Sequence, residues 1–231
     1  MTTVLVAGAT GAVGSALVPH LRLRGFEVIP HVRPKTAERH PLGKDPVALV
    51  IDLAESPRLD AAMARAQAVV CLVGTMRKRF AAGDTYESSD YRSVVQLVES
   101  AKRVPAAQPR SFVLVSSLGA RPGAGYLGWK HKAEQGVRES GLPFAILRPS
   151  VLDSTHAGSQ PSDGVQRKPP PLLGAMVRLI GALPGLRDVS LDWRPMPVEV
   201  LCSAIARILE GTAPNAVLVG RDLWRLAQVG G

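Results

Sequence analysis

The stretch Gly8-Ala9-Thr10-Gly11-Ala12-Val13-Gly14 decides the fold, because of what stands on either side of it. Residues 4–7 before it form a short apolar run typical of a strand, and residues 13–24 after it have the apolar spacing of a helix. Between a strand and a helix, the first glycine permits a tight turn, the second lets the backbone approach a pyrophosphate, and the third lets the helix pack closely. We therefore predict a dinucleotide-binding turn at Gly8, Gly11 and Gly14, with a purely structural glycine-rich turn as the alternative.

The chain up to residue 150 continues as an alternation of predicted strands and helices. The strands are apolar throughout, which indicates a parallel sheet covered on both faces. We therefore predict an α/β fold, a doubly wound parallel sheet of the Rossmann type, over residues 1–150. The further strands are expected at 26–32, 47–51, 68–73, 111–116 and 144–147, and the further helices at 58–66, 91–102 and 126–140.

The composition changes after Pro149. Residues 153–171 are rich in Ser, Gly, Gln and Pro, which predicts a mobile loop. We expect residues 151–231 to form a small C-terminal substrate-binding or lid region, packed on the same domain over the carboxyl edge of the sheet. Within this region, helices are expected at 172–183, 198–209 and 222–228, and a strand at 216–219.

Composition and charge exclude several classes of protein. Apolar residues make up 46% of the chain and charged residues 20%, as in an ordinary globular protein. The net charge is +9, but the basic residues are dispersed and aromatic residues make up only 4%, so we expect no nucleic-acid partner. Cys71 and Cys202 form no disulfide framework, and the histidines show no ligand spacing, so we predict no metal site.

No signal peptide and no membrane-spanning segment are visible in the sequence. The most apolar late stretch, residues 172–186, is interrupted by Arg178, by glycines and by Pro184. We therefore expect a cytoplasmic protein. A small-molecule substrate is expected but not identified, and oligomerisation remains possible.

The end of the second strand bears on the choice of coenzyme. Proteins that bind NAD usually place an acidic residue there, for the ribose 2′-hydroxyl. Here the strand ends His31-Val32-Arg33-Pro34-Lys35, which offers two cations and no carboxylate. The Arg33 guanidinium can bind a 2′-phosphate through two parallel hydrogen bonds, with Lys35 nearby. This pattern favours NADP(H) over NAD(H), and a solvated Arg33 is the alternative.

Two further strand ends carry candidate coenzyme contacts. Asp52 follows the third strand and could accept from the adenine amino group, although a helix cap is the alternative role; Leu53 beside it is included in the predicted site. Val73 and Gly74 end the fourth strand, where a small residue lets a ribose lie against the backbone.

Tyr126 and Lys130 are the candidate catalytic pair. They are four residues apart in a predicted helix and so share one face. A nearby ammonium group favours the phenolate, which would let the phenol exchange a proton with a carbonyl or alcohol oxygen. Ser116 and Ser117 end the preceding strand, and a hydroxyl there could bind the same oxygen. A half-buried tyrosine with a solvated lysine is the alternative.

These motifs together resemble the short-chain dehydrogenase/reductase superfamily. The glycine spacing and Leu147-Arg148-Pro149 are similar to its extended and atypical branches, including the NAD-dependent epimerase/dehydratase-like proteins. The resemblance is closer to the atypical branch around the Tat-interacting oxidoreductase. It is carried by Cys71-Leu-Val-Gly74-Thr-Met-Arg77, Asp90-Tyr91, Ser116-Ser-Leu-Gly-Ala120 and Tyr126-Leu-x-x-Lys130.

The resemblance implies an NADPH-binding Rossmann protein. By it, Tyr126 would donate or accept the proton and Lys130 would bind the nicotinamide ribose. It also implies pyrophosphate contacts at the glycine turn and packing near the carboxamide after the sixth strand. The cofactor-binding residues that it adds are Thr10, Ala12, Val13, Pro149 and Val151.

Two functional hypotheses follow. The first is an NADP(H)-dependent oxidoreductase that moves a hydride to or from a carbonyl or alcohol carbon, with Tyr126 as proton donor or acceptor. The second is a non-catalytic NADPH-binding sensor or scaffold protein, whose partner surface would lie in residues 153–186. The Tyr126 and Lys130 pair favours the first hypothesis, because a sensor has no need of a proton donor.

Overall fold

The computed structural model describes residues 1–75, 80, 83–105, 111–155, 161, 168–170, 172–183, 185–211 and 213–228. These residues form a seven-stranded sheet of order β3-β2-β1-β4-β5-β6-β9, in which every pair of neighbours is parallel. This confirms the predicted doubly wound fold. The strands are β1 (Thr3–Ala7), β2 (Glu27–Val32), β3 (Leu49–Val50), β4 (Ala68–Cys71), β5 (Ser111–Val115), β6 (Phe144–Arg148) and β9 (Ala216–Val219).

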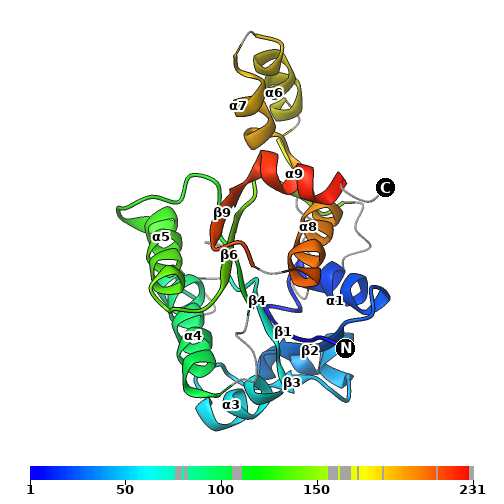
Figure 1. Ribbon diagram of the computed structural model, residues 1–231, viewed down its shortest axis with the longest axis vertical. Coiled ribbons are helices and arrows are strands. Elements are labelled where there is room, and N and C mark those ends of the chain that lie inside the picture. The colour runs from blue at the N-terminus through cyan, green and yellow to red at the C-terminus, as the bar shows by residue number, and fades with distance from the viewer. Residues whose placement is uncertain are drawn as a thin grey trace.

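Helices cover both faces of the sheet, as Figure 1 shows. One face carries α3 (Ser56–Arg65), α4 (Ser93–Arg103) and α5 (Gly125–Arg138), and the other carries α1 (Gly14–Leu23) and α8 (Val198–Glu210). Each face has its own apolar core. The unbroken apolar strands therefore reflect burial on both sides, as the sequence predicted.

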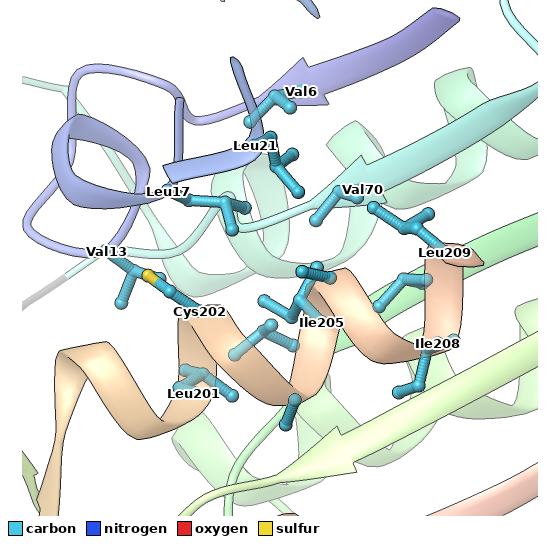
Figure 2. Close-up of a cluster of buried hydrophobic side chains, with 14 of the residues drawn as sticks. Val6, Val13, Leu17, Leu21, Val70, Leu201, Cys202, Ile205, Ile208 and Leu209 are labelled. Atoms are coloured by element: carbon cyan, nitrogen blue, oxygen red, sulfur yellow. The ribbon is translucent and has the colours of Figure 1, made fainter. Parts of the chain in front are cut away.

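The core between α1, α8 and the sheet joins the two ends of the chain. Leu201 and Ile205 of α8 belong to the same buried cluster as Leu17 of α1 and Val70 of β4 (Figure 2). At the surface of this contact, Arg24 donates to Glu210, which lies 186 positions later in the chain, over 2.6 Å.

Two elements of the C-terminal part, β9 (Ala216–Val219) and α8 (Val198–Glu210), belong to the sheet and its helical cover. β9 pairs with β6 through Ala145↔Ala216 to Arg148↔Val219, and so forms the seventh strand of the sheet. Together with α8, it belongs to the layers that the sequence reading assigned to residues 1–150 alone. The physical reason is that β6 would otherwise be an uncovered sheet edge, with its backbone groups unpaired.

The remaining elements lie beyond the carboxyl edge of the sheet. β7 (Leu152–Asp153) pairs with β8 (Met196–Pro197), and the helices α6 (Leu173–Gly181) and α7 (Arg187–Trp193) stand apart from the sheet at the top of Figure 1. Arg221 of α9 (Gly220–Gln228) holds α7 through Asp188 at 2.9 Å and Asp192 at 2.6 Å. Most of the loop predicted at 153–171 lies outside the described residues.

Short irregular helices interrupt the regular pattern. After β2 come α2 (Pro34–Ala37) and the 3-10 turn η1 (Pro41–Lys44). Before α4, the chain forms a π-helical turn, η3 (Glu87–Arg92), so α4 begins two residues later than predicted. Such π turns are frequent at functional sites.

Candidate active site

The glycine turn has the local geometry that its sequence predicted. Gly8 has φ +84°, and a Cβ there would lie 3.0 Å from the backbone of Leu72 and Val73. A Cβ on Gly14 would lie 2.3 Å from the Gly8 carbonyl oxygen, so only glycine lets α1 pack against the turn. A Cβ on Gly11 would lie 3.3 Å from the Gly8 carbonyl oxygen, which is a tight contact but the only one within 4 Å beyond its chain neighbours. α1 also begins without a side-chain cap at Val13, as an anion-binding helix start requires.

A cleft of about 270 Å³ opens at the carboxyl ends of β1 to β4. Its other wall is the π turn η3 together with the start of α4. The predicted cofactor-binding residues that line it are Gly8, Thr10, Gly11, Arg33, Asp52, Leu53, Val73 and Gly74. The lining residues that the sequence reading did not single out for the site are His31, Leu72, Asp84, Ser88, Ser89, Arg92, Ser93 and Gln96.

The other predicted cofactor residues, among them Gly14, Tyr126 and Lys130, lie outside this lining. Ala12 and Val13 are buried at the start of α1, behind the turn. Pro149 is buried after β6 and accepts from the Leu118 amide over 3.0 Å. Val151 is 42% exposed, and its carbonyl accepts from the Met196 amide at the β7 and β8 pair.

Charged groups stand at the entrance to the cleft. The Arg33 guanidinium lies at the N-cap of α2 and donates to Asp84 over 3.1 and 3.4 Å. Lys35 is exposed two residues further on. Asp52 uses one carboxylate oxygen to accept from the Ala54 amide at 3.1 Å, so it stabilises the turn after β3 while lining the cleft.

His31 forms part of the cleft floor at the end of β2. Its Nε2 lies 3.1 Å from the Ile51 carbonyl oxygen, and the ring is buried. Burial lowers the pKa of His31 to about 4, so the imidazole is neutral at physiological pH. The sequence reading did not place it in the site, because a lone histidine in a strand carries no motif.

Lys130 is buried and paired with an acid that the sequence reading did not assign to the site. Its Nζ lies 3.0 Å from Asp90 Oδ1 and donates to the Val115 carbonyl oxygen at 3.3 Å. Asp90, in the π turn η3, accepts from the Thr75 amide with its other oxygen at 3.1 Å. Burial alone lowers the pKa of Lys130, but the Tyr126 phenol and the Asp90 carboxylate outweigh it, so the pKa is raised. The lysine is therefore cationic.

Gly74 makes room for this ion pair. A Cβ there would lie 2.9 Å from Asp90 Oδ1 and 3.4 Å from Lys130 Nζ. The sequence pattern explained the small residue by the approach of a ribose. The geometry adds a second reason, since any side chain at this strand end would press on the buried pair.

Tyr126 lies one turn before Lys130 on the same face of α5. The lysine Nζ is 5.9 Å from the centre of its ring. The Tyr126 ring also contacts Tyr86 with centroids 5.4 Å apart, and Tyr86 contacts Phe80 at 4.8 Å. A short run of aromatic rings therefore leads away from the predicted proton donor.

The two candidate serines have different surroundings. Ser116 is buried and its hydroxyl donates to Glu134 Oε1 at 2.6 Å. The same carboxylate accepts two hydrogen bonds from Arg148, at 2.8 and 2.6 Å. Ser116 is thus part of a buried network between β5, α5 and β6. Ser117 is half-buried, and its hydroxyl lies 3.4 Å from the Leu118 carbonyl oxygen.

The described residues contain neither a cluster of metal ligands nor a membrane-spanning helix. In that part of the chain, no group of three or more His, Cys, Asp or Glu side chains is arranged to hold a metal ion. None of the helices described there has both the length and the apolar character needed to cross a bilayer.

Comparisons with known proteins show the family to which the chain belongs. A family model described as NAD(P)H-binding matches residues 8–174. The chloroplastic protein TIC 62 of Arabidopsis thaliana is 31% identical over 177 residues, covering 65% of this chain and 27% of that protein. The chain therefore spans less than a third of that relative. Sanguinarine reductase of Eschscholzia californica is 25% identical over 196 residues, covering 68% of this chain and 71% of the reductase.

A solved structure shows the same fold over nearly the whole chain. It comes from Bacillus halodurans and is assigned to the NAD-dependent epimerase/dehydratases. It matches with a TM-score of 0.66 and 21% identity, covering 99% of this chain and 100% of that one.

Proposed function

Because the chain belongs to the NAD(P)H-binding family, in the atypical short-chain dehydrogenase/reductase branch related to TIC 62, we propose that it is an NADP(H)-dependent oxidoreductase. One observation carries the proposal. The glycine turn, Arg33 and Gly74 line one cleft. The buried Asp90 and Lys130 pair lies directly behind Gly74, and Tyr126 lies one helical turn from the lysine.

The residues of the cleft fit a dinucleotide with a phosphorylated ribose. Gly11, which lines the cleft, and the uncapped start of α1 suit a pyrophosphate, because backbone N–H groups and the helix dipole there favour an anion. Asp52 and Leu53 would border the adenine. Arg33 would bind the 2′-phosphate, which is the reason for preferring NADP(H) over NAD(H).

The chemistry that the bound coenzyme supplies is transfer of a hydride between its nicotinamide ring and a substrate carbon. Tyr126 would give a proton to the carbonyl oxygen, or take one from the alcohol, and Ser117 would hold the same oxygen by a hydrogen bond. Lys130 would keep the phenol acidic and bind the nicotinamide ribose. Ser116 would support the site only indirectly, since its hydroxyl is bound to Glu134.

The substrate would approach over the elements between β6 and β8. We narrow the proposed substrate-binding region from the predicted residues 151–231 to residues 151–197, because β7, α6 and α7 stand at the carboxyl edge of the sheet. The contacting rings of Tyr126, Tyr86 and Phe80 favour a substrate with an aromatic or other flat apolar part. Sanguinarine reductase is a relative whose name states a reduction, which supports the reaction class.

A second candidate function is an NADPH-binding sensor or scaffold without turnover. The exposed apolar side chains of α6 and its flanks favour it, because Leu172 is 78% and Leu179 72% exposed. Such a surface is typical of a partner-binding site. The buried ion pair beside Tyr126 favours the oxidoreductase, since a sensor would gain nothing from it.

The proposal is tested by titrating the purified protein with NADPH and with NADH, followed by a screen of carbonyl substrates in which NADPH consumption is measured. We expect tighter binding of NADPH and turnover of at least one carbonyl substrate. Binding without turnover of any substrate would support the sensor. If neither coenzyme bound, both proposals would be wrong.

Location and partners stay predictions. The cytoplasmic location expected from the sequence competes with a plastid one, since relatives such as TIC 62 are described as chloroplastic. Fractionation of the source cells, with detection of this chain, decides between them. The absence of a nucleic-acid partner is checked by a binding titration at low salt.

A further inference from the structure

Asp84 occupies the place that the proposed function assigns to a coenzyme phosphate. The Arg33 Nη1 atom donates to Asp84 Oδ1 at 3.1 Å and to Oδ2 at 3.4 Å. Both residues line the same cleft, Arg33 from the end of β2 and Asp84 from the segment before the π turn η3. The Asp84 side chain is 19% exposed and that of Arg33 38%, so the pair is partly screened from water.

We propose that Asp84 is a coenzyme-selectivity residue, an internal anion that competes with the 2′-phosphate for Arg33. This inference rests on the proposed function. A 2′-phosphate that binds Arg33 must displace the carboxylate or lie beside it, and either event costs free energy, because like charges then meet or an ion pair is broken. A coenzyme that carries a ribose hydroxyl instead leaves the pair intact. Asp84 therefore narrows the preference for NADPH over NADH.

The other charged groups of the cleft do not take over this role. Arg92 lines the opposite wall, and its guanidinium is engaged by Glu87 at 3.0 and 2.7 Å. Asp52 accepts from a backbone amide in its own turn. His31 is neutral. Among the described lining residues, Arg33 is therefore the group for which the Asp84 carboxylate and the coenzyme 2′-phosphate compete.

Replacement of the acid by its amide isolates the charge. Asp84→Asn keeps the shape of the side chain and an oxygen that accepts from Arg33, but removes the negative charge. The fold should tolerate it, because partly exposed ion pairs contribute little to stability. Asp84→Ser, which shortens the side chain, is the second variant, and Asp60→Asn removes an equal charge from the exposed pair with Arg103, outside the cleft.

The experiment is a double-mutant cycle on coenzyme affinity at one fixed salt concentration. The dissociation constants of NADPH and NADH are measured for the wild type, Arg33→Ala, Asp84→Asn and the double variant. We expect Asp84→Asn to tighten NADPH binding about tenfold and to leave NADH within about twofold. In the Arg33→Ala background, Asp84→Asn should change the NADPH constant by less than about twofold. Asp60→Asn should change neither constant.

The outcomes separate the two proposals. If Arg33→Ala removes the NADPH preference but both Asp84 variants leave the NADPH to NADH ratio unchanged, the selectivity inference is wrong and the proposed coenzyme site stands. A gain that is equal for both coenzymes, or that persists without Arg33, also overturns the inference. If Arg33→Ala leaves the ratio unchanged, the placement of the 2′-phosphate at Arg33 is itself wrong.

Discussion

The ammonium group of Lys130 lies 3.0 Å from the carboxylate of Asp90, with the two side chains 5% and 0% exposed. The pair joins α5 to the π turn η3. It lies against Gly74 of the cleft, and the lysine Nζ is 5.9 Å from the centre of the Tyr126 ring. Because each charge is balanced by the other, Lys130 stays protonated in a place that would otherwise favour a neutral amine.

Removal of the Asp90 charge should therefore destabilise the fold. Asp90→Asn leaves a buried ammonium without its anion, and we expect the free energy of unfolding to fall by about 3 kcal/mol. Urea denaturation measures this free energy of unfolding. Glu87→Gln is the matched control, because Glu87 lies in the same π turn but pairs with Arg92 at the surface, and should cost less than about 1 kcal/mol. Equal effects of the two variants would show that burial of the pair does not matter.

The phenol of Tyr126 is expected to carry the proton transfer. Tyr126→Phe should lower kcat by roughly 100-fold or more and leave the NADPH dissociation constant within about threefold, because only the hydroxyl is lost. Tyr86→Phe, which removes the same group from the neighbouring ring, should keep turnover. Steady-state kinetics on the best substrate of the carbonyl screen decides it, and unchanged turnover in Tyr126→Phe would remove this residue from catalysis.

Ser116 and Ser117 should respond differently to the same substitution. Ser116→Ala removes a buried hydrogen bond to Glu134 and should lower stability by about 1 kcal/mol with kcat nearly unchanged. Ser117→Ala should lower kcat about tenfold with little change in stability, if its hydroxyl holds the substrate oxygen. Thermal melting and kinetics on both variants test this. A catalytic loss confined to Ser116→Ala would reverse the assignment.

Two glycines of the first turn offer a matched pair of alanine variants. Gly14→Ala places a Cβ 2.3 Å from a backbone oxygen and should lower the free energy of unfolding by about 3 kcal/mol. Gly11→Ala meets only one atom, at 3.3 Å, so it should fold but bind NADPH at least about tenfold more weakly, since its methyl group enters the predicted pyrophosphate space. Full coenzyme affinity in Gly11→Ala would contradict binding at this turn.

Acidification should destabilise the protein partly through His31. Burial lowers its pKa from 6.5 to about 4, so between these values the unfolded chain binds a proton that the folded chain does not. The contribution of neutral, buried His31 to the free energy of unfolding is therefore fully present above pH 6.5, and it is lost as the pH falls toward 4. From pH 7 to pH 5, the wild type should lose about 2 kcal/mol more than His31→Gln. Chemical denaturation at several pH values measures the difference, and parallel curves would show that His31 is not the cause.

Local features of the fold could be predicted from the sequence. The strand β9 and the turn from Gly8 to Gly14 lie where their patterns placed them, because strand propensity and glycine geometry act over a few neighbouring residues. The third strand was predicted over residues 47–51, but β3 contains only Leu49 and Val50. It is short because it lies at the sheet edge and has a partner on one side only.

Long-range pairings could not be predicted in this way. Asp90 looks like an ordinary polar residue just before the predicted helix 91–102, until Lys130, forty positions later, is placed against it. Asp84 likewise gives no sign in the sequence that it pairs with Arg33, which lies 51 positions earlier. Neighbouring serines point in different directions at a strand end, so the sequence could not tell that Ser116 would bind Glu134. The addition of β9 to the sheet beside β6 likewise depends on contacts that no local pattern records.

The packing of α8 on α1 has a consequence for how the molecule matures. During synthesis the glycine turn and α1 leave the ribosome before α8, so the apolar side of α1 stays without a cover until α8 has been made. A fragment cut at residue 174, where the family match ends, would expose the apolar side of α1 to solvent. It would also leave β6 as an unpaired sheet edge. Expression vectors for this protein should therefore extend through α9. During synthesis, binding of chaperones should be strongest just before α8 emerges.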